Sequence, residues 1–193
     1  MGDFKFNTTK IPGLFVIEPK VHGDDRGFFM EHYNYEDFKK AGIDLHFVQD
    51  NHSRSQKGVL RGLHYQRKRP QGKIIRVVAG TVFDVAVDLR KGSPVFGEWF
   101  GIELRAQERK MVYVPRGCAH GFLTLTDDVD FMYKCTDIYI PEDESGLLWN
   151  DPHVGIKWPL DKIGNAPKLS ERDKKWPTLN KINLPFDFDK YRI

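Results

Sequence analysis

Two short stretches decide the fold of this chain: RGLHYQ at residues 61–66 and PRGCAHGF at residues 115–122. Both are punctuated by glycine and predict short strands that bend or turn at the glycine. They put His64 and His120 on separate strands, with Arg61 beside the first. In a small β-barrel, side chains on such strands point into a shared interior. The two stretches therefore predict a polar site inside a barrel.

Turn residues divide most of the chain into short segments that are enriched in β-branched and aromatic residues. The expected strands are residues 14–17, 27–32, 47–51, 58–66, 74–78, 82–89, 99–104, 111–114, 120–125 and 129–139. Between two of them, Ala79 and Gly80 predict a tight hairpin. So many strands without alternating helices indicate a closed or sandwiched antiparallel sheet.

The sequence predicts little helix. Asn34 suits the N-cap of a short helix over residues 35–41, and Gly42 suits its C-terminal stop. Beyond residue 161 the chain is richer in proline and charge, which predicts turns and short helical pieces on the outside. We find no repeat and no dividing linker, so residues 1–193 are expected to form one mainly β domain with short peripheral helices.

Composition narrows the class of protein. The 30 basic and 27 acidic residues nearly balance, which argues against a nucleic-acid partner. Cys118 and Cys135 each fall in an apolar strand pattern, so we expect neither a disulfide framework nor a zinc knuckle, and a reducing compartment. The first residues lack the apolar core of a signal peptide, and no stretch reaches membrane-spanning length. We therefore expect a cytoplasmic protein without a membrane partner.

Alternation sorts the side chains of residues 82–88 by face. Phe83, Val85 and Val87 form an apolar face expected between the sheets. The other face, expected to line a cavity, carries Asp84 and Asp88 together with Val82 and Ala86.

On a regular strand Arg61 and His64, three residues apart, would point in opposite directions. A bulge at Gly62 would bring both side chains to one pocket.

The spacing Pro115-x-Gly117-x-x-His120 is similar to the second cupin motif, a turn that presents a histidine inside a jelly-roll barrel. The first cupin motif usually has two histidines one residue apart, but here His64 is followed by Gln66 at that spacing. A histidine with a glutamine is a poor start for a zinc, iron or manganese site. The sequence thus predicts a cupin-type jelly-roll barrel without metal, whose histidines are free for proton transfer.

Several motifs occur in a fixed order along the chain. They are DRGFFME at 25–31, FVQDN at 47–51, RGLHYQ at 61–66, Lys73 with DVAVD at 84–88, PRGCAHGF at 115–122, YK at 133–134, LWNDP at 148–152 and LSERD at 169–173. By these motifs, at family-like intervals, the chain resembles the dTDP-4-dehydrorhamnose 3,5-epimerases, enzymes of dTDP-L-rhamnose synthesis, over roughly residues 11 to 177.

The resemblance implies roles for four catalytic residues. His64 is the family's base, and Asp173 is the carboxylate that orients it. Lys73 corresponds to the group that stabilises the enolate, and Tyr133 to the proton donor. These parts are what inversion beside a keto group requires, namely a base, an enolate holder and an acid. Without the resemblance, Lys73 also fits a surface lysine and Tyr133 a core tyrosine.

The sequence has no glycine-rich phosphate loop, so we expect side chains, and arginine above all, to hold the diphosphate. The resemblance implies that Arg61 and Arg26 bind phosphate and that Phe29 lines the thymine. It also implies substrate contacts for Glu31, Gln49, Asp50, Asn51, His120, Glu144 and Arg172. Arg172 departs from the lysine more usual in the family. Family members are homodimers that exchange N-terminal strands, so Arg26, Phe29 and Glu31 are candidates to serve the neighbouring subunit's site.

We therefore expect a cofactor-free epimerase that inverts C3 and C5 of dTDP-4-dehydro-6-deoxy-D-glucose, an isomerase of rhamnose biosynthesis. The nearest alternative is a relative that inverts one centre, or a keto-isomerase of a related dTDP-keto-sugar. A metal-dependent cupin enzyme is disfavoured by Gln66. A non-catalytic nucleotide-sugar binding module would have no use for a base and an acid in one pocket.

Overall fold

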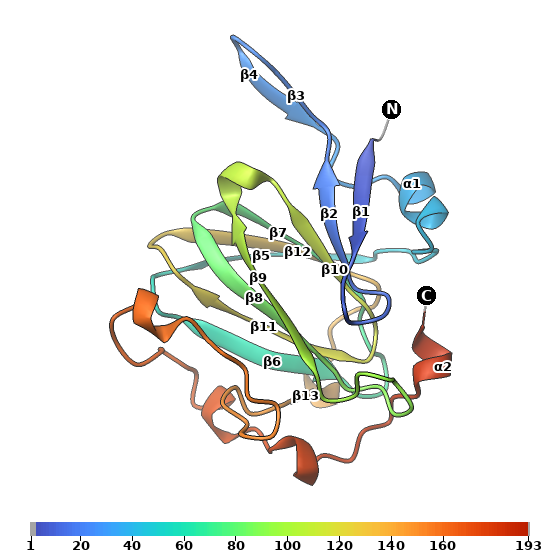
Figure 1. Ribbon diagram of the computed structural model, residues 1–193, viewed down its shortest axis with the longest axis vertical. Helices are drawn as coiled ribbons and strands as arrows, with labels where there is room; N and C mark the ends of the chain where they lie inside the picture. Colours follow the sequence, from blue (N-terminus) through green and yellow to red (C-terminus); the bar gives the residue numbers. More distant parts are fainter. Residues whose placement is uncertain (1–2, 193) are drawn as a thin grey trace.

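The computed structural model describes residues 3–192, and its regular structure is mostly β-strand (Figure 1). The strands are β1 Phe4–Thr8, β2 Phe15–Pro19, β3 Val21–Asp24, β4 Gly27–Met30, β5 Gln49–Ser55, β6 Leu60–Gln66, β7 Lys73–Ala79, β8 Thr81–Asp88, β9 Trp99–Arg105, β10 Met111–Val114, β11 Cys118–Thr124, β12 Val129–Cys135 and β13 Glu144–Gly146. The α-helices are α1 Tyr35–Lys40 and α2 Phe188–Tyr191, and the 3-10 turns are η1 Ala106–Glu108, η2 Pro141–Asp143, η3 Leu160–Lys162, η4 Asp173–Lys175 and η5 Leu179–Lys181. No helix within residues 3–192 is long and apolar enough to cross a membrane.

Two antiparallel sheets form the walls of a barrel (Figure 1). The six-stranded sheet has the order β1-β2-β10-β7-β12-β5, and the five-stranded sheet has the order β13-β6-β11-β8-β9. A separate hairpin, β3-β4, projects away from the barrel beside β1 and β2. The structure therefore has the mainly β, short-helix architecture that the sequence predicts.

The connection between β7 and β8 differs from the prediction. The sequence predicted a tight hairpin at Ala79 and Gly80, but the two strands belong to different sheets. Gly80 has a φ of 77°, and a Cβ there would lie 2.7 Å from Thr126 Oγ1. This short link carries the chain from one wall of the barrel to the other. Turn residues alone do not determine which strands pair, which is why the sequence predicted a hairpin here.

Alternation along β8 separates two apolar clusters. Val82 and Ala86 belong to the cluster between the two sheets. Val85 and Val87 belong to a second cluster, which includes Phe186 and other residues of the C-terminal segment. The prediction that the purely apolar face packs between the sheets is therefore wrong. That face is covered instead by the segment that follows β13.

The predicted bulge in β6 is present. Cross-strand pairing shifts so that His64 lies opposite His120 while Arg61 lies opposite Phe122. Gly62 has a φ of 119°, and a Cβ on it would lie 2.6 Å from the Cα of Gly121. Two facing glycines thus let β6 and β11 approach closely at the bulge.

Helix α1 begins as predicted. The Asn34 side chain accepts hydrogen bonds from the backbone N–H groups of Glu36 and Asp37. The sequence did not predict strands β1, β3 and β13. Each is short, and β13 reads Glu144-Ser145-Gly146, which lacks β-branched and aromatic residues.

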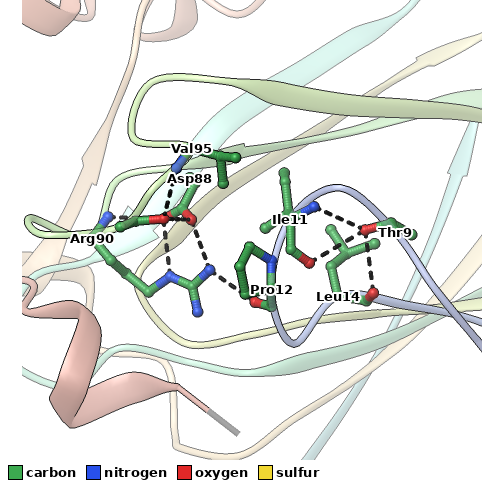
Figure 2. A network of polar contacts seen from close by, with 8 residues as sticks. Thr9, Ile11, Pro12, Leu14, Asp88, Arg90 and Val95 are labelled. Carbon is green, nitrogen blue, oxygen red and sulfur yellow. Dashed lines mark hydrogen bonds and ion pairs between the residues drawn. The ribbon is translucent and has the colours of Figure 1, made fainter.

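A buried ion pair joins the end of β8 to the loop after β1 (Figure 2). The side chains of Asp88 and Arg90 are both fully buried. Arg90 Nε and Nη2 donate to the two carboxylate oxygens of Asp88 at 2.9 and 2.7 Å, and Nη2 also donates to the Pro12 carbonyl at 2.9 Å. The Phe188 ring of α2 lies 5.0 Å from the guanidinium. This network fixes three segments that are distant in the sequence.

Candidate active site

A cavity of about 400 Å³ is lined by residues of both sheets and of the C-terminal segment. Its size suits a small-molecule ligand. Most of the predicted site residues line it. They are Gln49, Asn51, Arg61, His64, Lys73, His120, Tyr133, Glu144, Arg172 and Asp173.

His64 and Asp173 form a hydrogen-bonded pair at this cavity. His64 Nε2 lies 2.6 Å from Asp173 Oδ1, and the Asp173 side chain is almost fully buried. Burial acts to raise the pKa of Asp173, but hydrogen bonds from His64, Ser170 and Trp176 outweigh it and hold the pKa below its usual value. The carboxylate therefore stays charged and holds the imidazole in one orientation.

Trp176 also contacts Asp173, and this contact was not predicted from the sequence. Its Nε1 donates to Asp173 Oδ1 at 3.1 Å. On β13, Gly146 lies opposite His64, and a Cβ at Gly146 would lie 2.5 Å from the indole. The glycine therefore provides the space that Trp176 occupies. A lone tryptophan in a proline- and charge-rich tail gave no signal of this role.

Lys73 and Tyr133 lie on the wall opposite His64. They belong to β7 and β12 of the six-stranded sheet, whereas His64 belongs to β6 of the five-stranded sheet. The Lys73 ammonium is 5.8 Å from the centre of the Tyr133 ring. Burial lowers the pKa of Lys73 and raises the pKa of Tyr133 to about 12. The phenol is therefore protonated at neutral pH and can donate its proton.

His120 has a carboxylate partner of its own. Its Nε2 lies 2.8 Å from Asp84 Oδ2, and both side chains are buried. The imidazole is stacked near the Phe131 ring, with centroids 6.1 Å apart. The cavity is thus lined by two histidines on the neighbouring strands β6 and β11, and each histidine is paired with an aspartate.

Gln66 and Arg61 have different partners. The Gln66 side chain donates to the Ile140 carbonyl at 2.8 Å and accepts from the Ile140 N–H at 3.2 Å. Both ends of this amide are therefore used to fix the backbone next to η2. Arg61 Nε and Nη2 each donate to Ser55 Oγ at 3.2 Å, which directs the guanidinium along the cavity wall.

A family model described as dTDP-4-dehydrorhamnose 3,5-epimerase matches residues 8–181. The chain belongs to this family. A relative described as dTDP-4-dehydrorhamnose 3,5-epimerase, from Pseudomonas aeruginosa, is 53% identical over 166 residues, which cover 86% of this chain and 90% of the relative.

Solved structures agree with this assignment. A dTDP-6-deoxy-D-glucose-3,5-epimerase from Legionella pneumophila, in complex with dTDP-4-keto-L-rhamnose, is 47% identical, with a TM-score of 0.91 over 95% of this chain and 98% of that chain. A 3′-monoepimerase from Streptomyces bikiniensis, in complex with dTDP-quinovose, is 39% identical, with a TM-score of 0.83 over 89% and 86%. The epimerase family has the cupin-type jelly roll, so the predicted fold class is confirmed, as is the prediction of an isomerase.

Four predicted substrate contacts of the epimerase lie outside this cavity within one chain. Side chains alternate along a strand, so Asp50, which lies between the cavity residues Gln49 and Asn51, points to the opposite face of β5. There it forms an ion pair with Lys134 at 2.8 Å. The other three, Arg26, Phe29 and Glu31, lie on or just after the projecting β3-β4 hairpin. Phe29 is 66% exposed, which is unusual for a large apolar side chain in a hairpin. Their roles remain predictions.

Within residues 3–192 the epimerase brings together no group of three or more histidine, cysteine, aspartate or glutamate side chains that could hold a metal ion. Several cavity residues were not predicted as site residues, among them Tyr139 and Cys135. Cys135 lies opposite Lys73 in the β7-β12 register. Alternation gave a signal for both, because Cys135 and Tyr139 lie two and six residues from Tyr133 in the predicted strand 129–139. In the structure β12 ends at Cys135, so Tyr139 reaches the cavity from the chain that follows the strand.

Proposed function

We propose that this epimerase inverts C3 and C5 of dTDP-4-dehydro-6-deoxy-D-glucose, with His64 as base, Lys73 as enolate holder and Tyr133 as acid. The proposal rests on one observation, that His64 lies on one wall of the cavity and Lys73 and Tyr133 lie on the opposite wall. His64 and Asp173 approach the cavity from the side of the five-stranded sheet, and Lys73 and Tyr133 line it from the six-stranded sheet. Inversion requires removal of a proton from one face of the sugar and its return to the other face.

The base is the Nδ1 atom of His64. Nε2 is within hydrogen-bond distance of the Asp173 carboxylate, so the proton of the neutral imidazole is assigned to Nε2 and the lone pair to Nδ1. When Nδ1 takes the proton from C5 or C3, the electron pair of the C–H bond passes to the keto oxygen as an enolate. Lys73 stabilises that oxygen, and Tyr133 protonates the carbon from the opposite side.

The test is incubation with dTDP-4-dehydro-6-deoxy-D-glucose in deuterated water. Epimerisation of both centres incorporates deuterium at C3 and C5 and gives the L-lyxo product, which proton NMR resolves. Deuterium at one carbon alone would identify a single-centre epimerase, and a moved carbonyl would identify a keto-isomerase. Binding without exchange would leave a nucleotide-sugar binding module.

The nucleotide half of the substrate is assigned to Arg61 and to the projecting hairpin. We infer a homodimer in which Arg26 and Phe29 serve the site of the neighbouring subunit. This inference is supported by a hairpin that stands away from its own cavity and exposes Phe28 and Phe29. Arg26 is held at the hairpin tip by Asp24.

Mixed dimers test this exchange. Arg26→Ala and His64→Ala variants are each expected to be inactive or strongly impaired alone. Unfolding and refolding them together would produce dimers with one intact site if the hairpin crosses between subunits. Recovery of about a quarter of the wild-type activity is then expected from random pairing. Absence of recovery, with mixed dimers verified by a tag, would mean that Arg26 acts within its own chain.

We place the epimerase in the cytoplasm. Both cysteines are buried and unpaired, as expected for a protein of a reducing compartment. Fractionation of cells that make the tagged protein would test this assignment. Recovery of the protein with the periplasmic or membrane fraction would contradict it.

A further inference from the structure

Glu144 has three partners at the cavity. Its side chain forms an ion pair with Arg172, and Oε2 accepts a hydrogen bond from the Tyr139 hydroxyl at 2.9 Å. Oε1 lies 3.9 Å from His64 Nδ1. The Glu144 side chain is 9% exposed, whereas the Arg172 side chain is 53% exposed. The carboxylate is therefore fixed inside the cavity, and its cationic partner lies at the solvent side.

Strand pairing explains why Glu144 is close to the base. Gly146 lies opposite His64 and Glu144 lies opposite Gln66 in the β13-β6 pair. Residues two apart on a strand share a face, so Glu144 is the diagonal neighbour of His64. Asp173 contacts Nε2 of the imidazole and Glu144 stands beside Nδ1. A carboxylate thus faces each nitrogen of the ring.

The position beside Nδ1 has a consequence for the proton transfer. Nδ1 is the nitrogen that gains a proton when the base acts, so positive charge develops 3.9 Å from Glu144 Oε1. Attraction over such a distance is substantial at the dielectric constant of a partly buried site. In the free enzyme, however, the charge of Glu144 is already neutralised by Arg172.

We propose that Glu144 and Arg172 form an exchangeable ion pair and that Glu144 is a positioning residue for the base. The substrate diphosphate draws Arg172 away from Glu144, and the released carboxylate then stabilises the imidazolium of His64. The inference rests on the proposed function, in which His64 is the base. A diphosphate competes well for this arginine because it offers more charge than one carboxylate and fits the guanidinium fork. The imidazolium would thus gain this stabilisation only with substrate bound.

The proposal predicts opposite effects of one substitution on binding and on chemistry. Glu144→Gln frees Arg172, so dTDP should bind about two- to fivefold more tightly, the scale of one exposed ion pair. The same variant should lose tenfold or more in the rate of deuterium incorporation at saturating substrate. Calorimetry with dTDP and proton NMR in deuterated water measure the two quantities. Glu144→Asp, which keeps the charge, should recover part of the rate.

Three further variants complete the experiment. Arg172→Met should weaken dTDP binding, and adding Glu144→Gln to it should no longer tighten binding. Glu98→Gln, which breaks an exposed ion pair with Lys10, is the matched control and should change neither quantity. Weaker dTDP binding by Glu144→Gln, or an unchanged exchange rate, would overturn the proposal. A wild-type enzyme that incorporates no deuterium would instead refute the proposed function, and the dTDP affinities would still report on the ion pair.

Discussion

Two acid–base pairs of this epimerase differ in how far they are enclosed. In the Asp88–Arg90 pair both side chains are fully enclosed, and the arginine directs three hydrogen bonds to Asp88 and Pro12. In the His64–Asp173 pair the imidazole is 22% exposed and is held through Nε2, which leaves Nδ1 toward the cavity. The first pair connects chain segments. The second orients an imidazole whose other nitrogen is not bound by Asp173, so the first pair serves the fold and the second serves the cavity.

The largest effect is expected where the His64–Asp173 pair loses His64, the proposed base. His64→Ala should abolish deuterium exchange and product formation, because a general base contributes on the order of 10²- to 10⁴-fold. Binding of dTDP should survive. Proton NMR and calorimetry measure both, and the exposed His153→Ala serves as a control. Half of the wild-type exchange rate in His64→Ala would refute the assignment of the base.

Breaking the Asp88–Arg90 pair should lower the free energy of unfolding instead of the activity. Arg90→Met leaves the Asp88 carboxylate buried without its partner, which typically costs about 3–5 kcal/mol. Urea denaturation should record this loss, while the activity per folded molecule stays near that of the wild type. A free energy of unfolding within about 1 kcal/mol of the wild type would mean that the pair does not connect the segments as described.

Tyr133, the proposed acid on the opposite wall, sharpens the comparison. Tyr133→Phe removes only a hydroxyl, so packing is kept and His64 can still remove and return the same proton. Isotope exchange should persist at some level, while net inversion falls by roughly two orders of magnitude. Tyr35→Phe, whose hydroxyl contacts Asp44 outside the cavity, is the control. Full-speed formation of the L-lyxo product by Tyr133→Phe would assign the acid to another group.

A smaller effect is expected from removing Arg61, the proposed phosphate ligand. Arg61→Ala should weaken dTDP binding by about 1.5 to 3 kcal/mol, the usual contribution of a charge-assisted hydrogen bond. Calorimetry checks this, with the exposed Arg105→Ala as a control for general loss of charge. Equal affinities of wild type and Arg61→Ala would make Arg61 a structural residue that only fixes Ser55.

The smallest effect concerns the support of Asp173. Trp176→Phe keeps an aromatic ring against Gly146 but removes the N–H that donates to Asp173. One hydrogen bond of about 0.5–1.5 kcal/mol corresponds to a two- to tenfold slower exchange. Single-turnover exchange at saturating substrate measures it. A rate equal to that of Arg105→Ala would limit Trp176 to packing.

The His64–Asp173 pair could be predicted from the sequence better than the Asp88–Arg90 pair. His64, Asp173 and Tyr133 could be found because their motifs match a family, and the bulge at Gly62 follows from the need to turn Arg61 toward the same pocket. Trp176 could not be found, because its space depends on a glycine that pairs with His64 only after folding.

Other misses have the same origin. The crossing at Gly80 was predicted as a hairpin because turn residues do not specify which strands pair. The partner of Arg90 is two residues away, but its contact with Pro12 joins the barrel to a loop 78 residues distant. Long-range contacts of this kind leave no local pattern.

Asp173, the partner of His64, is synthesised after all the strands of both sheets. The last barrel strand ends at Gly146, and Asp173 lies 27 residues further along the chain, in the segment that covers the outer face of β8. A ribosome that has released β13 has released both walls, His64 included, but not Asp173. Because chains fold in part while they are made, the sheets can assemble around an imidazole that still lacks its partner. A nascent chain therefore contains both sheets before it contains the carboxylate that orients His64, and a chain stopped after β13 would have His64 without Asp173.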